Sequence, residues 1–166
     1  LVDATLKRLL TDNPFAVGLS TGWEPDAFDG KDAEYKDKPG HDASGRYVPY
    51  AIRANGAAVI EALVDYDKDG AGDYYQVPKK TGKDLLTEPY TYNVGGKDTL
   101  MTSFMVPLMF DGTFKAVSGV DVALDALAAD MSRLTPLGEG YVALLSQGGS
   151  IVSHPATATL GKTLKD

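Results

Sequence analysis

Residues 65–121 read DYDKDGAGDYYQVPKKTGKDLLTEPYTYNVGGKDTLMTSFMVPLMFDGTFKAVSGVD, and this stretch decides the fold. Two apolar runs, residues 99–110 and 114–124, are joined by Asp111-Gly112, and a shorter run at residues 90–94 precedes them across a Gly-Gly pair. Segments rich in apolar, β-branched and aromatic residues, separated by short turns that contain Gly, are typical of antiparallel strands. The centre of the chain is therefore predicted to be an antiparallel meander.

The segments on both sides of the meander predict helices and further strands. Apolar residues recur with helical spacing in residues 1–13 and 123–134, and Pro14 ends the first of these helices. A short helix that ends at Gly82 is expected over residues 73–83. The remaining strands are expected at residues 15–23, 45–53, 57–65, 141–146 and 150–154, with Asn55-Gly56 as the turn between the second and the third.

This order of elements predicts the α+β class, because helices are segregated from an antiparallel sheet instead of alternating with parallel strands. Pro49 lacks a backbone donor, which places its strand at an edge of the sheet. Three parts are expected: the end of a longer helix at residues 1–14, a sheet domain at 15–134, and the beginning of a second sheet at 135–166. The chain starts with Leu and its final strands stop in mid-pattern, so we interpret it as a piece of a longer protein.

Composition excludes several classes of function. The chain has 166 residues, a formal net charge of -7 and no cysteine. An acidic chain offers no basic face for phosphates, so a nucleic-acid partner is not expected, whereas a cationic small molecule suits this charge. The lack of cysteine excludes disulfides and thiolate metal sites. No apolar run reaches the length of a membrane helix, and no signal peptide is visible.

Asp65, Asp67, Asp69 and Gly70 match the first half of a calcium-binding loop, in which alternate carboxylates converge on one cation. The twelfth position is Gln76 where such a loop needs a bidentate Glu, and a strand is expected before the motif where a helix should stand. A solvated acidic turn is the simpler interpretation, and no metal or cofactor is expected.

Enzymatic motifs are weak. His41 and His154 lie in segments that read as loops, and neither accompanies a Gly-x-Ser-x-Gly nucleophile motif. A Ser-His-Asp triad assembled in space stays open at this point, but the sequence favours a protein that is not an enzyme.

Four of the nine tyrosines lie within 19 residues, at Tyr74, Tyr75, Tyr90 and Tyr92. The last two are two apart in a predicted strand and so share one face of the sheet. Tyrosine is a common strand residue, and a plain core role explains the cluster equally well. Asp121 favours a binding site, because it stands among valines in an otherwise apolar strand and a buried carboxylate needs a partner.

At these residues the chain resembles the extracytoplasmic double-Cache sensor domains of bacterial methyl-accepting chemotaxis proteins. The resemblance covers most of residues 17–166 and rests on five blocks: GRYVPYAIR, LVDYDKDGAGDYYQVPKKTG, LTEPYTYNVGGKDTLMTSFMVP, AVSGVDVALDAL and GYVALLSQGGSIVSHPATATLGKTL. It implies a long helix, a membrane-distal PAS-like domain that binds ligand, and the start of a membrane-proximal one. It also implies a periplasmic location, a membrane-anchored parent protein and a homodimer in the full receptor.

Family members that bind amino acids carry Arg-x-Trp-Tyr, then Tyr-x-Asp, then an Asp in the last distal strand. By this resemblance Tyr74, Tyr75, Tyr90 and Asp121 are ligand-binding residues, whereas the Arg position holds Gly72 and the middle Asp position holds Tyr92. Gly72 cannot pair with a carboxylate, and Tyr92 adds an aromatic face for a cation. The implied ligand is a small cationic amine or quaternary ammonium compound, such as a polyamine, a biogenic amine, choline or a betaine.

Several alternatives remain at this stage. Asp73 is a second candidate anion, and Trp23 is a candidate wall of the site or a core residue. Lys97 or Arg46 would replace the missing cation if either reached the site, which keeps an amino-acid ligand open. The same sensor domain also occurs on histidine kinases and diguanylate cyclases, while a hydrolase or a calcium-stabilised interaction module represents a different class.

Overall fold

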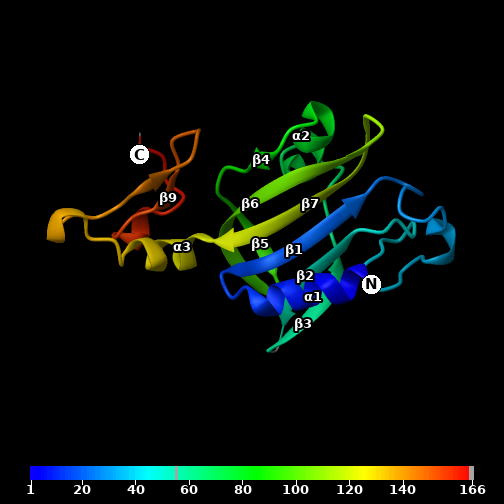
Figure 1. Ribbon diagram of the computed structural model, residues 1–166, viewed down its shortest axis with the longest axis horizontal. Helices are drawn as coiled ribbons and strands as arrows, with labels where there is room; N and C mark the ends of the chain where they lie inside the picture. The colour runs from blue at the N-terminus through cyan, green and yellow to red at the C-terminus, as the bar shows by residue number, and fades with distance from the viewer. Residues whose placement is uncertain (55, 165–166) are drawn as a thin grey trace.

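The computed structural model describes residues 1–54 and 56–164, and Figure 1 shows a twisted sheet with a helix on each face and a small second sheet beyond its end. The helices are α1 (Val2–Asp12), α2 (Asp73–Thr81) and α3 (Leu124–Met131), with short 3-10 turns at Asp32–Glu34, Pro136–Gly138 and Thr157–Thr159. The strands are β1 (Ala16–Trp23), β2 (Pro49–Ala54), β3 (Ala57–Ala62), β4 (Leu85–Leu86), β5 (Tyr90–Val94), β6 (Lys97–Phe110), β7 (Thr113–Ala123), β8 (Leu144–Leu145) and β9 (Ile151–Ser153).

The main sheet has the order β3-β2-β1-β7-β6-β4, with β5 also paired to β6, and every pairing is antiparallel. The predicted α+β class and the antiparallel meander are thus confirmed. β7 lies in the middle of the sheet, between β1 and β6. Its side chains therefore point into one of two covered faces, and only one of these faces contains the candidate site.

Alternating residues of the strands separate the two faces. Ala51 packs with Leu6 and Leu10 of α1, whereas its neighbours Tyr50 and Ile52 belong to the cluster under α2. Successive side chains of a strand point to opposite faces, so α1 and α2 cover opposite sides of the sheet. The side under α2 holds the larger cluster and most of the tyrosines.

Two elements differ from expectation. β2 lies between β3 and β1, so the prediction that Pro49 marks an edge strand is wrong. Pro49 is the first residue of β2, a position where the missing donor is tolerated. The predicted turn at Asn55-Gly56 includes Asn55, which lies outside the described residues, although the hairpin of β2 and β3 on either side is confirmed.

The C-terminal part is less regular than predicted. The last helix ends at Met131, three residues earlier than expected, and the second hairpin consists of the short strands β8 and β9. α3 packs against β9 and links the two sheets. Within the described residues, no helix has both the length and the apolar character needed to cross a membrane.

We expect Leu10→Ala to lower the free energy of unfolding by about 2–5 kcal/mol, because Leu10 is fully buried between α1 and the sheet. Leu9→Ala is the matched control: its side chain is 45% exposed on the same helix, and the change should stay near 0.5 kcal/mol. Urea unfolding followed by circular dichroism measures both. Equal effects of the two substitutions would contradict the docking of α1 described here.

Candidate ligand-binding site

A small cavity of about 10 Å³ lies under α2, against the face of the sheet that includes Asp121. This volume accommodates roughly one water molecule. Five strands of the main sheet, the residue after β3 and α2 contribute side chains to its wall. The lining residues are Ser20, Tyr50, Leu63, Tyr74, Tyr90, Tyr92, Met101, Met105 and Asp121. Three of the predicted tyrosines and the predicted carboxylate therefore meet at one point.

Among the described residues that line this inner cavity, Asp121 is the only acidic one, and it is 6% exposed. Burial raises the pKa of its carboxyl group, and a hydrogen bond from Ser103 Oγ at 2.5 Å offsets part of that rise. None of the ion pairs found among the described residues includes Asp121. The carboxylate thus lies in the core with one hydroxyl donor and no countercharge.

Ser103 connects Asp121 to Tyr90. The two hydroxyls of Tyr90 and Ser103 are 2.7 Å apart, and because the Ser103 hydrogen is donated to Asp121, Tyr90 is the donor in this contact. Ser103 and Asp121 are directly opposite each other on β6 and β7. The pairing of these strands therefore sets the distance between the two side chains.

The Tyr50 ring reaches Asp121 because β1 has a glycine at the crossing point. Gly18 pairs with Asp121 across β1 and β7, and a Cβ added to Gly18 would lie 2.4 Å from the Tyr50 hydroxyl. That hydroxyl is near enough to Asp121 to counter part of the rise in the carboxyl pKa, yet its geometry falls short of a hydrogen bond and it has no other partner among the described residues. A buried hydroxyl without a partner is a site where a bound water or ligand would form the hydrogen bond.

The tyrosine hydroxyls of the cavity are neutral at pH 7. Burial raises the pKa of all of them, and it raises that of Tyr92 to about 12. The rings of Tyr50 and Tyr92 lie edge to face at 6.0 Å, and those of Tyr90 and Tyr92 do so at 6.4 Å. Aromatic faces in different planes therefore surround a single carboxylate.

A larger groove of about 630 Å³ shares Tyr74, Tyr90 and Tyr92 with the inner cavity. Its volume is in the range of small-molecule sites. Its wall runs along residues 85–92 and includes three carboxylates, those of Asp65, Asp73 and Glu88. No Lys or Arg is among the described residues that line either hollow, so the whole site is acidic.

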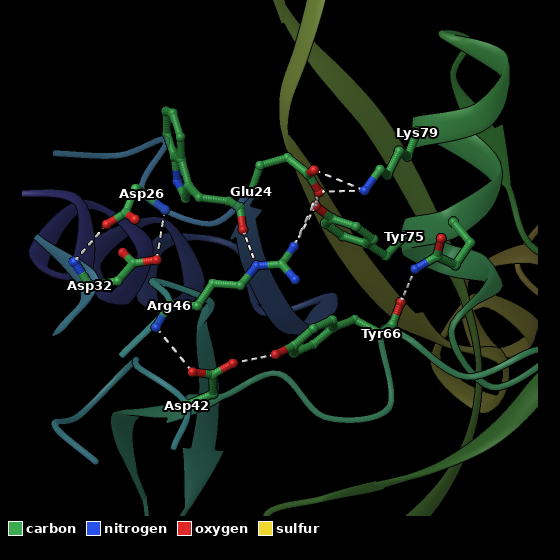
Figure 2. Close-up of polar contacts among 10 residues, drawn as sticks. Glu24, Asp26, Asp32, Asp42, Arg46, Tyr66, Tyr75 and Lys79 are labelled. Atoms are coloured by element: carbon green, nitrogen blue, oxygen red, sulfur yellow. Dashed lines mark hydrogen bonds and ion pairs between the residues drawn. The ribbon is translucent and has the colours of Figure 1, made fainter. Parts of the chain in front are cut away.

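Tyr75 lies outside the cavity, unlike its neighbour Tyr74. Its hydroxyl donates to Glu24 and accepts from Arg46, and Figure 2 shows this network with Lys79 on the other side of Glu24. The Tyr74 hydroxyl instead donates to Val64 O at 2.7 Å. The two residues thus attach α2 to different parts of the chain, and only Tyr74 faces the candidate site.

The other predicted site residues are dispersed. The Trp23 ring meets Phe28 edge to face at 5.0 Å and stacks on Phe110 at 6.4 Å, and it lines neither hollow. Asp73 lies at the rim of the groove, where its Oδ1 accepts a hydrogen bond from Gly70 N at 3.2 Å.

Neither candidate cation reaches the site. The Arg46 guanidinium lies over the rings of Tyr66 and Tyr75, at 4.5 Å and 4.9 Å from their centroids, and it pairs with Glu24. Burial works against ionisation of Glu24, but hydrogen bonds from Lys79 and Tyr75 hold the pKa of its carboxyl below the usual value. Lys97 begins β6 and lines a different hollow, with Asp98 and Leu124.

The calcium and hydrolase alternatives gain no support from the geometry. Across residues 1–54 and 56–164, no group of three or more His, Asp or Glu side chains is arranged to hold a metal ion. Asp65 pairs with Lys68 at 2.6 Å. His41 stacks on Tyr35, His154 contacts Tyr141, and neither histidine lines the cavity or the groove.

Ser103 contacts Asp121, and Tyr50 and Ser20 line the cavity, but none of the three was predicted from the sequence. Ser103 is predictable from the sequence, because a hairpin around Asp111-Gly112 places it opposite or next to Asp121. Tyr50 is not predictable in this way, because its proximity to Asp121 depends on the order of the strands in the folded sheet.

Comparisons with known proteins agree with this description. Residues 2–129 match the family described as methyl-accepting chemotaxis protein-like, first PDC sensor domain. The chain is 33% identical over 175 residues to the methyl-accepting chemotaxis protein TlpQ of Pseudomonas aeruginosa, covering 96% of this chain and 24% of that receptor. The solved extracellular domain of the putative histidine kinase mmHK1S-Z3 is 43% identical with a TM-score of 0.82, covering 96% of this chain and 57% of the other. Methyl-accepting chemotaxis protein X is 34% identical with a TM-score of 0.77, covering 97% and 59%.

The chain belongs to the family of first PDC sensor domains of methyl-accepting chemotaxis protein-like receptors. It spans about a quarter of TlpQ and just over half of the two solved chains. The family consists of ligand-binding sensor domains rather than enzymes, and the predicted periplasmic location is confirmed by this membership.

We expect Asp121→Asn to stabilise the unliganded protein at pH 7 by about 1–3 kcal/mol, the scale of an uncompensated buried polar group. Burial raises the pKa of Asp121 in the folded protein above its ordinary value of 3.8, so the folded protein binds the proton more tightly than the unfolded chain. Stability is therefore highest below pH 3.8 and falls as pH rises from there through the raised pKa. The gain in stability from Asp121→Asn should shrink as pH falls towards 3.8, because the carboxyl group of the wild type becomes protonated. Thermal unfolding of both proteins between pH 4 and pH 8 measures it, and loss of stability at pH 7 would contradict the absence of a countercharge.

Proposed function

We propose that this chain is the ligand-binding part of a chemoreceptor and that it senses a small cationic amine. The observation that carries the proposal is the buried, unpaired carboxylate of Asp121, surrounded by tyrosine rings in a site without a basic side chain. An ammonium group would supply the missing countercharge, and the faces of Tyr74, Tyr90 and Tyr92 would attract it further.

The size of the inner cavity favours one kind of cationic head. A space for about one water molecule admits a primary ammonium group, whereas a trimethylammonium group would have to displace tyrosine rings. The remainder of such a ligand would lie in the groove, where Asp73 makes no ion pair among the described residues. Polyamines and biogenic amines therefore fit better than choline or betaine.

An amino acid is the weaker alternative. Recognition of an α-carboxylate normally uses a cationic side chain, and Gly72 stands where the resemblance places that arginine. Arg46 is committed to Glu24 and Tyr75, and Lys97 lies at another surface. A carboxylate in the groove would instead face Asp73 and Glu88.

The wider assembly is a further part of the proposal, supported by the family to which the chain belongs. We assign residues 15–134 to the membrane-distal sensor domain and residues 135–166 to the start of the proximal one, in a membrane-anchored and homodimeric receptor. Ligand would act by favouring one of two arrangements of the sheet and helix. The relatives include chemoreceptors and a putative histidine kinase, so the same domain on a kinase or a diguanylate cyclase is the second assignment of output.

A thermal-shift screen with 1,4-diaminobutane, choline, glycine betaine and L-alanine tests the class of ligand. Stabilisation by a ligand at 100 times its Kd is about 2.7 kcal/mol, which gives a readily measured shift. We expect the diamine to stabilise most and L-alanine to have no effect. Stabilisation by L-alanine alone would overturn the proposal.

We expect Asp121→Asn to weaken binding of 1,4-diaminobutane by at least about 30-fold, because the ammonium loses its buried charge partner. Tyr35→Phe is the control, since Tyr35 stacks on His41 and lines neither the cavity nor the groove. Isothermal titration calorimetry measures both affinities. Unchanged affinity in Asp121→Asn would place the ammonium elsewhere.

A further inference from the structure

The carboxylate of Glu88 joins two parts of the chain that are distant in sequence. Its Oε2 accepts hydrogen bonds from Ser146 Oγ at 2.5 Å and Ser150 Oγ at 3.0 Å, while its Oε1 accepts one from Gly148 N at 2.8 Å. The three donors belong to the turn between β8 and β9 of the second sheet. Glu88 itself lies between β4 and β5 in the wall of the ligand groove.

The turn is shaped to receive this carboxylate. A Cβ added to Gly148 would lie 2.8 Å from Glu88 Cδ, so any larger residue there would push the carboxylate away from the amide. Ser150 N donates to Ser146 Oγ at 2.9 Å, and Ser146 N donates to Ser150 O at 2.9 Å. These bonds hold both hydroxyls on the same side of the turn.

Glu88 is thereby occupied even though it lines the groove. Hydrogen bonds from Ser146 and from Gly148 hold the pKa of its carboxyl below the usual value. With three donors in place, the carboxylate is satisfied by protein and is less available than Asp73 to a ligand ammonium.

The other end of this contact leads to Asp121. Only Pro89, whose φ angle is fixed by its ring, separates Glu88 from Tyr90. The Tyr90 hydroxyl is linked through Ser103 to Asp121. The short, stiff segment 88–90 therefore contacts the inner cavity at Tyr90 and the second sheet at Glu88.

We propose that Glu88 is a positioning residue that fastens the groove wall bearing Tyr90 to the turn of the second sheet, so that a change at Tyr90 reaches residues 146–150. Because the contact exists in the free protein, it stands or falls independently of which ligand binds.

Hydrogen–deuterium exchange of the free protein, read at the amides of residues 146–150, tests the contact. We expect Glu88→Ala to speed exchange there by about tenfold, the effect of losing a hydrogen bond to a charged group, with Glu88→Gln intermediate. Gly148→Ala should give a similar increase from the opposite side of the contact. Amides of β7 should be unchanged, which separates local release from global destabilisation.

Asp73→Asn is the matched control, since it removes a carboxylate from the same groove without touching the turn. It should leave exchange at residues 146–150 unchanged. Equal exchange in Glu88→Ala and the wild type would overturn the proposal, as would an equal increase in Asp73→Asn.

A double-mutant cycle tests transmission. Tyr90→Phe breaks the hydrogen bond to Ser103 and should speed exchange of the turn by about threefold in the wild-type background, but not further in Glu88→Ala. Tyr92→Phe, two residues along the same strand, should leave the turn unchanged. No effect of Tyr90→Phe, or the same effect with and without Glu88, would refute the link.

Discussion

Burial of the Asp121 carboxylate between β1 and β6, without a countercharge, is the constraint on which the rest of the site depends. The backbone pairing of three strands holds this charge where water cannot fully solvate it, and Ser103 supplies only partial compensation. On the proposed function, a bound ammonium group would offset this unfavourable burial of charge. The proposed affinity for a positive charge would then depend on strand pairing as much as on the residues that line the cavity.

The two adjacent tyrosines of α2 attach the helix to different parts of the structure. Tyr74 faces the cavity and donates a hydrogen bond to Val64 O, while Tyr75 joins the part-buried network of Arg46 and Glu24. Arg46 also donates to Trp23 O and lies against the Tyr66 ring, so the network joins the end of β1, the long loop after it and α2. A helix fixed in this way can present Tyr74 to a ligand without shifting as a whole.

Local signals in the chain were sufficient for most of the fold. The meander of β5, β6 and β7 follows from turns and alternation that act over a few residues, and the shared face of Tyr90 and Tyr92 follows from the period of a strand. Non-local features were out of reach. The order of the strands brings Tyr50 to Asp121 and places β2 inside the sheet. A register shift near Leu108 decides which residue of β6 lies opposite Asp121. The turn of the helix points Tyr74 and Tyr75 in different directions.

Gly18 has no side chain and does not line the inner cavity, yet its lack of a side chain affects the shape of that cavity. The Tyr50 phenol occupies the space where a Cβ at position 18 would stand. A methyl group there would clash with the ring and force it to move, and because Tyr50 lines the inner cavity, the shape of the cavity would change. The shape of the inner cavity can therefore change through a residue that does not itself line it, by the gain or loss of a single carbon atom.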